Sequence, residues 1–268
     1  GCSFCEYDSF SPNLQEKKSK FKLNPRINEN PYLDNQLKQL EMQFNATKQR
    51  LQNKFGTQKF IVYFQSFTNT YAPFSTLKAL YEKALSFDNV IGLSIGTRTD
   101  CVTDEILDYL VDLSKDKEIW IEFGIQSFFD ETLININRGD TASNMKYWIN
   151  RSKEKGLNVC GHLIYGLPNE TQEMMLETFR QTVELKVDSI KFHPLYVVKN
   201  TLLTNEFKKG RFTPISEELY IDTVVKSIKI LPENISIQRI TAGINDSTLL
   251  SPDWCRDKHT QMKNIRLA

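Results

Sequence analysis

The sequence has no apolar run that approaches the ~18 residues needed to cross a membrane, and it shows no signal peptide. Its five cysteines, an odd number in 268 residues, do not resemble a secreted disulfide framework. The formal net charge is only +1, so any contact with nucleic acid would depend on a local basic patch. We therefore expect a cytoplasmic protein without a membrane segment.

Short apolar runs alternate with segments of helical length. The runs cover residues 60–65, 90–95, 119–123, 157–165 and 189–197, and a further one covers 235–240. Each is almost continuously apolar, as expected for strands that are buried on both faces of a parallel sheet. The alternation of strand and helix favours a parallel sheet with right-handed crossovers, and 268 residues fit one such domain.

The segments between the runs carry helical signals. Leucine and phenylalanine recur at three-, four- and seven-residue intervals from Leu33 to Phe55, which predicts one long amphipathic helix. Thr103 is a candidate N-cap for a helix over residues 104–113. Further helices are predicted over residues 169–185 and 216–231.

Cys2 and Cys5 form a C-x-x-C pair with Phe4 just before the second cysteine. The spacing alone fits half a zinc site, a redox dithiol or part of an iron–sulfur loop. A zinc site would need a second nearby pair, but the three other cysteines are scattered singly. A thioredoxin-type dithiol should open a helix, whereas turn-forming residues follow this pair. On spacing alone these alternatives stay open.

Short motifs follow one another along almost the whole chain. They are residues 1–5 (GCSFC), 63–73 (YFQSFTNTYAP), 92–101 (GLSIGTRTDC), 122–127 (EFGIQS), 137–139 (NRG), 162–168 (HLIYGLP) and 209–214 (KGRFTP). Together they resemble the radical S-adenosylmethionine (radical SAM) superfamily. The resemblance is to the bacterial branch that is similar to the Elongator catalytic subunit but lacks its acetyltransferase domain.

The resemblance implies an α/β fold, an incomplete (β/α) TIM-like barrel of radical SAM type. The first barrel strand and part of the cluster loop have no counterpart in the chain and are expected to be missing from it. We expect residues 1–268 to form a single barrel domain with a C-terminal extension over about 232–268.

In this family three cysteines hold a [4Fe–4S] cluster, SAM chelates the fourth iron, and one electron cleaves SAM to a 5′-deoxyadenosyl radical. The resemblance therefore makes Cys2 and Cys5 cluster ligands. The family's first cluster cysteine lies upstream of this pair and has no counterpart here. We accordingly expect this chain to hold no intact cluster and its N-terminal loop to be poorly fixed.

The resemblance also places SAM among polar residues near the carboxyl ends of the strands. The residues implicated are Gln65, Thr68, Asn69, Glu122, Gln126, Ser127, Arg138, His162 and His193. The loop after residue 65 would supply acceptors for the SAM ammonium. Glu122, expected at the end of its strand, would accept from the SAM ribose or ammonium, and Arg138 would pair with the SAM carboxylate. Without the resemblance, we would expect Arg138 to form a surface ion pair and His162 to be a buried core residue with its hydrogen bonds satisfied.

For function, the resemblance points to tRNA modification at the wobble uridine, with a flavodoxin- or ferredoxin-type electron donor. Basic residues 17–26, with Lys208, Lys209 and Arg211, would contact RNA phosphates. Arg98 and Asp100 are candidates for the substrate side of the site, with an internal ion pair as the alternative. Two other functions stay open: a radical SAM enzyme acting on a small metabolite, and a non-catalytic RNA-binding barrel.

Overall fold

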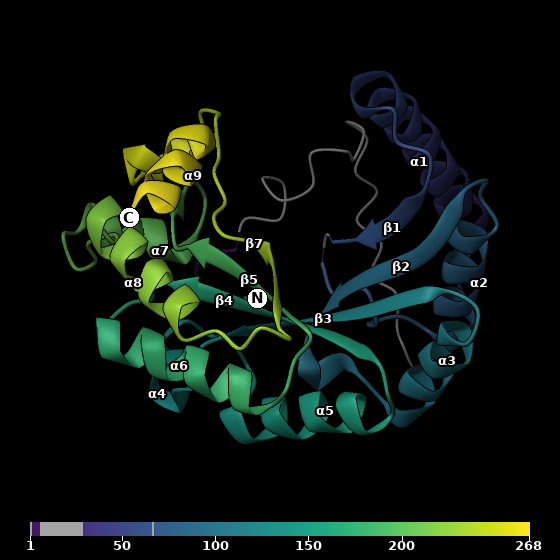
Figure 1. The fold of residues 1–268 in the computed structure, drawn as a ribbon, viewed down its shortest axis with the longest axis horizontal. Helices are drawn as coiled ribbons and strands as arrows, with labels where there is room; N and C mark the ends of the chain where they lie inside the picture. The colour runs from purple at the N-terminus through teal and green to yellow at the C-terminus, as the bar shows by residue number, and fades with distance from the viewer. Residues whose placement is uncertain (1, 6–28, 66) are drawn as a thin grey trace.

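The computed structural model describes residues 2–5, 29–65 and 67–268, and its centre is one parallel sheet. The six strands, in spatial order, are β1 (Phe60–Phe64), β2 (Val90–Thr97), β3 (Glu118–Gln126), β4 (Asn158–Tyr165), β5 (Ser189–Pro194) and β7 (Ser236–Arg239). The sheet curls so that β1 and β7 form the two edges of an open half-barrel (Figure 1). The prediction of an incomplete (β/α) barrel is confirmed.

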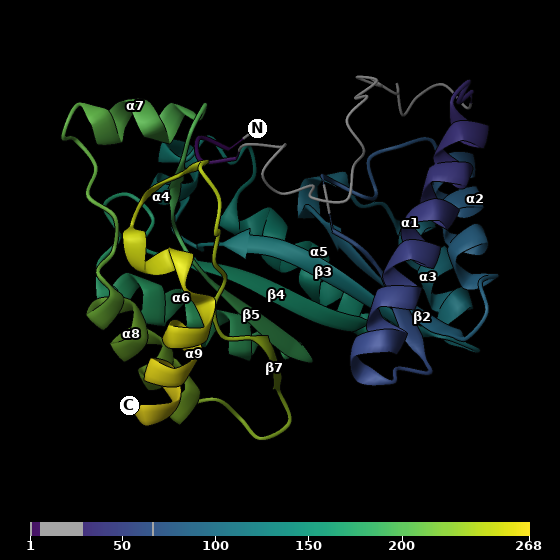
Figure 2. The same ribbon diagram turned by 90° about the horizontal axis from the view of Figure 1, so that it is seen from above.

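Helices cover the outer, convex face of this sheet (Figures 1 and 2). They are α2 (Phe74–Leu85), α3 (Asp104–Ser114), α5 (Ala142–Glu154), α6 (Gln172–Glu184) and α8 (Glu217–Lys229). Four of them begin where a side-chain hydroxyl accepts a hydrogen bond from a backbone N–H of the first turn. These N-cap residues are Thr103, Thr141, Thr171 and Ser216. Hydroxyl caps in the sequence therefore set the start of most of the outer helices.

The apolar core lies between the sheet and these helices. Phe192 of β5 is fully buried and stacks on Phe179 of α6, with ring centroids 5.9 Å apart. Since side chains alternate along a strand, Lys191 and His193 on either side of Phe192 must face the inside of the half-barrel. We call this inner space, which the concave face of the sheet lines, the lumen.

Two predicted strand boundaries are wrong. Residues 189–197 were expected to form one strand, but β5 ends at Pro194, which has no N–H to continue the ladder. The short β6 (Val197–Val198) instead pairs antiparallel with β8 (Leu249–Ser251). Strand β3 extends beyond residue 123 to Gln126, so Glu122 lies in mid-strand and not at the strand end.

The remaining elements lie around this frame. They are α1 (Leu33–Phe55), the 3₁₀ turns η1 (Thr99–Cys101) and η2 (Asp253–Arg256), α4 (Asp130–Asn135), α7 (Leu202–Lys208) and α9 (Lys258–Leu267). The predicted long helix α1 is confirmed, but none of its residues is buried. The predicted C-terminal extension contains β7, which completes the sheet. No helix in the described ranges is long and apolar enough to span a membrane.

Candidate active site

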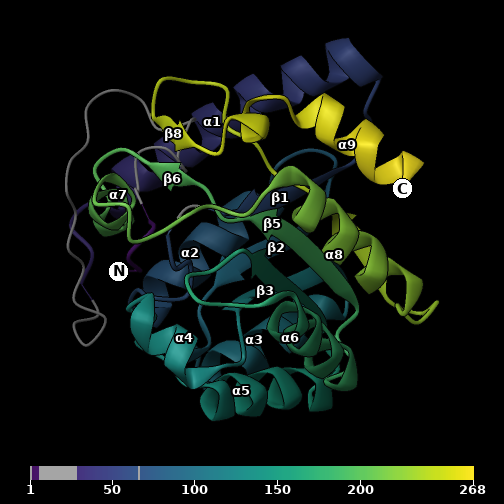
Figure 3. The same cartoon turned by 90° about the vertical axis from the view of Figure 1, so that its left-hand side faces the viewer.

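The cysteine loop is fixed at the carboxyl edge of the sheet. The Ser3 backbone N–H donates to Ile136 O (2.8 Å) after α4, and Ser3 O accepts from Leu203 N–H (2.9 Å) of α7. Phe4 is buried in the core. Figures 2 and 3 show the start of the chain close to α7. The expectation of a poorly fixed loop is therefore wrong for residues 2–5, because backbone hydrogen bonds hold them from two sides.

The thiols of Cys2 and Cys5 lie close enough to interact with each other. The Cys5 thiol donates a hydrogen bond to Cys2, and this contact, with the Arg138 guanidinium nearby, lowers the pKa of Cys2. The same contact and burial raise the pKa of Cys5. Arg138 Nη1 lies 3.8 Å from Cys2 Sγ. Two sulfurs that converge beside a cation fit the thiolate ligands of an iron–sulfur cluster. Among the described residues, no third metal-binding side chain joins them.

Gly124 on β3 is the point where two of the predicted SAM residues meet. Arg138 Nη2 donates to Gly124 O, and the Gln126 amide folds back over the same glycine. A Cβ at residue 124 would lie 2.8 Å from Gln126 Nε2 and 3.2 Å from Arg138 Nη2, so any larger residue would displace the ends of these two side chains. Two buried atoms here, Arg138 Nε and Gln126 Oε1, have no hydrogen-bond partner. An orphaned donor and acceptor beside the thiols fit a polar ligand such as SAM.

The loop after β1 lies against the end of β2. Asn69 Nδ2 donates to Phe64 O and to Gly96 O (2.9 Å each), and Tyr81 Oη donates to Asn69 O (2.5 Å). Both amide protons of Asn69 are thus used, and its Oδ1 remains as an acceptor, which is what an ammonium ligand requires. Gln65 is exposed and Thr68 is half-buried in the same loop.

Ser127 supports the strand end and has little capacity left for a ligand. Its hydroxyl donates to Glu170 Oε1 (2.5 Å) and accepts from Phe129 N–H (3.1 Å). Burial raises the pKa of Glu170 to about 7. Gln126, just before Ser127, adopts φ = 71°, a left-handed conformation that costs a non-glycine residue energy. The strained position of Gln126 thus directly precedes a serine that is bonded on both sides.

Glu122 is the centre of a polar network in the lumen. Its carboxylate accepts from Ser94 Oγ, from His162 Nε2 (2.6 Å) and from Lys191 Nζ (2.5 Å). It is 1% exposed, and although burial acts to raise its pKa, the bonds from His162 and Lys191 hold that pKa well below its usual value. Glu122, His162 and Lys191 come from β3, β4 and β5, so one carboxylate joins three neighbouring strands. Tyr63 of β1 lies over this group, with Lys191 Nζ 4.3 Å from the centre of its ring.

The cluster of Glu122, Cys160 and His162 is close enough to suggest a metal site. However, the Lys191 ammonium binds the same carboxylate oxygen as His162, at a position where a metal would have to sit. Burial also raises the pKa of the Cys160 thiol to about 12, which opposes formation of a thiolate ligand. This arrangement is an internal charge network and not a metal centre.

The two lumen histidines are neutral at physiological pH. Burial lowers the pKa of His162, so the neutral ring donates from Nε2 to Glu122. Burial, followed by the field of Arg239, lowers the pKa of His193 to about 3. His193 lies against Tyr196, with ring centroids 4.7 Å apart. The contact of His162 with SAM stays a prediction, and in the structure His162 is a satisfied internal group bonded to Glu122.

Two further predicted positions form internal contacts. Arg98 donates from Nε and Nη2 to Asp100 (2.7 and 2.6 Å), so the alternative of an internal ion pair is confirmed.

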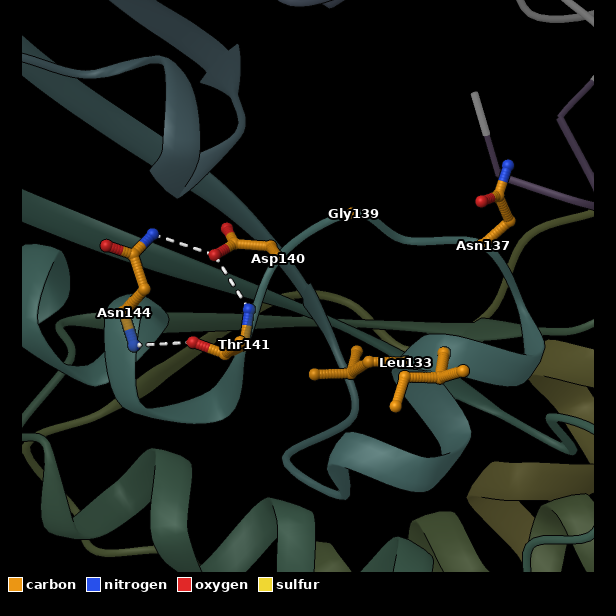
Figure 4. Close-up of a pocket in the computed structure, with 7 residues that line it drawn as sticks. Leu133, Asn137, Gly139, Asp140, Thr141 and Asn144 are labelled. Atoms are coloured by element: carbon orange, nitrogen blue, oxygen red, sulfur yellow. Dashed lines mark hydrogen bonds between the residues drawn. The ribbon is translucent and has the colours of Figure 1, made fainter.

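The loop after Arg138 borders a pocket lined by Leu133, Ile134, Asn137, Gly139, Asp140, Thr141 and Asn144 (Figure 4). Asp140 accepts from Asn144 Nδ2 and from Thr141 N–H, so these polar groups satisfy one another.

Sequence reasoning missed the residues that complete the lumen network. Tyr63, Ser94, Lys191 and Arg239 were not singled out, although three of them contact Glu122 or lie beside it. One signal was available: Lys191 stands two residues before His193, so a lysine and a histidine share one face of an apolar strand.

Comparisons with known proteins agree with this geometry. The Radical SAM superfamily matches residues 1–182, and the Radical_SAM C-terminal domain matches residues 187–267. Protein YhcC of Escherichia coli is 36% identical over 267 residues, which is 99% of this chain and 79% of that protein. The structure of Elp3 from Methanocaldococcus infernus superimposes with a TM-score of 0.72 at 20% identity, over 85% of this chain and 58% of that one.

A second group of relatives is more distant. The tRNA uridine(34) acetyltransferase of Methanocaldococcus jannaschii is 28% identical over 157 residues. The match covers 58% of this chain but only 28% of that protein.

The chain belongs to the radical SAM superfamily. Its cofactors are SAM and a [4Fe–4S] cluster. The converging thiols of Cys2 and Cys5, with the unpartnered atoms of Gln126 and Arg138 beside them, are compatible with both groups.

Proposed function

We propose that this chain is the catalytic barrel of a radical SAM enzyme that modifies tRNA at the wobble uridine. The observation that supports the substrate is the similarity to a tRNA uridine(34) acetyltransferase. Because this chain covers only 28% of that protein, the shared part concerns the barrel, and the acetyl transfer is not carried over.

In this proposal the residues have distinct tasks. Cys2 and Cys5 would bind iron atoms of the cluster. Gln126, Arg138 and Asn69 hold SAM, for which Arg138 offers the carboxylate partner and Asn69 an acceptor for the ammonium. A cluster held by these cysteines would supply the electron for cleavage of SAM.

Ser127, Glu170 and the Glu122 network act differently. Ser127 and Glu170 support the end of β3 next to Gln126, and their hydrogen bond is the observation that favours this role. Glu122 is fully engaged by three neighbours and lies four residues before Gln126 on β3, so we assign it to the lumen and not to a direct contact with SAM. The lumen side chains of Tyr63, His162 and His193 then face the space that a substrate would enter.

The RNA would approach from the carboxyl edge of the sheet. A uridine in a loop is already unstacked, so it can be turned into a site that lies inside a barrel. Lys208 and Lys209 at the end of α7 are free of ion pairs within the described residues, whereas Arg211 pairs with Glu206 at 2.6 Å. Residues 17–26 lie outside the described residues. A tRNA substrate and a flavodoxin- or ferredoxin-type reductant place the enzyme in the cytoplasm.

The test is a comparison of tRNA nucleosides. A strain that lacks the full-length gene should lose or accumulate one modified wobble uridine, detected by mass spectrometry of digested tRNA. The wild-type gene should restore the normal nucleoside, and a Cys5→Ala gene should not. Full-length protein should also bind tRNA, which retention of tRNA on a protein-binding filter measures. An unchanged nucleoside profile together with no retention would reject tRNA and favour a small-metabolite substrate.

A further inference from the structure

Arg239 extends into the lumen from the last strand of the sheet. It lies in register with Lys191 of the neighbouring β5. Its positive charge acts on His193, on His162 and on Tyr63, which belong to β5, β4 and β1. Lys191 reaches Glu122 inside the lumen, so Arg239, its register partner, also has its side chain on the lumen face of the sheet.

The positive charge of Arg239 is not balanced. Glu122 is committed to Lys191, and both lumen histidines are neutral. Among the described residues, no Asp or Glu forms an ion pair with Arg239. The one hydrogen bond that Arg239 forms with the described residues runs from Nε to Phe192 O (3.3 Å), and none of these residues binds either Nη group. The described lumen thus holds one cation more than it holds anions.

Two side chains that line the lumen are partly accessible to solvent. Tyr63 is 37% exposed, and the His162 side chain is 19% exposed, although both face inward. Arg239 is half-buried. A partly desolvated guanidinium without a carboxylate favours an anion with two coplanar oxygens, because the fork of N–H groups can bind both.

We propose that Arg239 makes the lumen an anion-binding subsite that receives a carboxylate or phosphate group of the substrate. Arg239 binds the two oxygens, and the neutral rings of His193 and Tyr63 border the group. The inference rests on the proposed function in one respect, since the anion is taken to be part of the molecule on which the radical acts. The SAM carboxylate is assigned elsewhere, to Arg138 beside the cysteine loop.

The three histidines of the sequence allow a direct test. His162 and His193 line the lumen, whereas His259 lies at the start of α9 and is exposed. Full-length protein with its oxidised cluster and saturating SAM is labelled with ¹⁵N-histidine and titrated separately with acetate and with inorganic phosphate. We expect at least one anion to shift the resonances of His193, and of His162 to a smaller extent, while His259 stays unchanged.

Arg239→Gln should weaken this binding by at least about tenfold. Lys229→Gln is the matched control, because it removes one positive charge from an exposed position of α8 and should leave the titration unchanged. If Arg239→Gln does not fold, Arg239→Lys answers the same question, since lysine keeps the charge but cannot bind two oxygens in a fork, and it should bind several-fold more weakly. A response to acetate assigns a carboxylate, and a response to phosphate alone assigns a phosphate.

The proposal is overturned if neither anion shifts the resonances of His162 and His193. It is equally overturned if Arg239→Gln shows the same shifts as the wild type; Arg239→Lys takes its place if Arg239→Gln does not fold. It is also overturned if adding SAM alone moves His193 and this effect disappears in Arg239→Gln, because the arginine would then belong to the cofactor. Filter binding of tRNA is scored separately. Protein that binds acetate through Arg239 but retains no tRNA keeps this subsite and rejects the tRNA proposal.

Discussion

Arg138 connects the two halves of the candidate cofactor site at the scale of single residues. One Nη lies against Cys2 Sγ and the other donates to Gly124 O, while Nε has no partner although it is buried. A buried donor without an acceptor is costly, and a ligand that supplies oxygen atoms would remove this cost. The same guanidinium therefore contacts the cysteine loop and keeps one buried N–H without a partner among the described residues.

Arg138→Lys should raise the dissociation constant of SAM by about tenfold or more, because lysine cannot form a forked contact with a carboxylate. Equilibrium binding of SAM to reconstituted full-length protein checks this, with iron content measured in parallel. Arg151→Lys, in the exposed pair with Asp104, is the control and should bind SAM normally. Unchanged affinity in the Arg138 variant would remove this residue from the site.

Glu170 links protonation to stability. Its pKa is raised from 4.5 to about 7, so the folded protein binds this proton more tightly than the unfolded chain does. The stabilisation is complete below pH 4.5 and is lost as the pH rises through 7, and its size is about 1–3 kcal/mol. Glu170→Gln cannot ionise and should lose less stability than the wild type between pH 5 and pH 8.

Thermal unfolding at a series of pH values measures this difference. Glu173→Gln, at an exposed position of α6, should follow the wild-type curve. Parallel curves for wild type and Glu170→Gln would show that the carboxyl group is not buried as described.

At the scale of elements, the structure depends on the contacts between β3, β4 and β5. Glu122 joins all three strands through buried bonds to His162 and Lys191. Removing one partner of a buried ion pair leaves the other charge uncompensated, whereas removing both can be nearly neutral.

Glu122→Leu alone and Lys191→Met alone should each reduce the free energy of unfolding by about 3–5 kcal/mol. The double variant should recover most of this loss, because neither charge is then left buried. Urea denaturation of the three variants gives the coupling energy. A double variant that is as unstable as the sum of the single variants would contradict the described network.

The strands could be predicted because each is an apolar run between polar helices, and all five runs plus the sixth near 235–240 are strands. The end of β3 could not, because Gly124 and Gln126 are poor strand formers that extend the strand only through pairing with β4. The Cys2–Cys5 pair and the predicted SAM residues were identified from the sequence motifs. Lys191 and Arg239 were missed because their partners are distant in the sequence and meet only when the sheet curls.

At the scale of the whole molecule, the open half-barrel separates two regions. The cysteine loop, Gln126 and Arg138 gather at the carboxyl edge, and the network around Glu122 lies deeper in the lumen. A radical formed at the carboxyl edge of the sheet would react with a substrate that the side chains of the lumen hold. The residues proposed to hold the cofactor and those proposed to face the substrate therefore lie in adjoining parts of the half-barrel.

The central claim is that Cys2 and Cys5 belong to a cluster that cleaves SAM. Full-length protein, reconstituted anaerobically with iron and sulfide and then reduced, should convert SAM to 5′-deoxyadenosine. Cys5→Ala should abolish this conversion, whereas Cys255→Ala, which changes a buried cysteine outside the site, should retain it. Stoichiometric zinc in the full-length protein, with no 5′-deoxyadenosine under any reducing condition, would contradict the assignment.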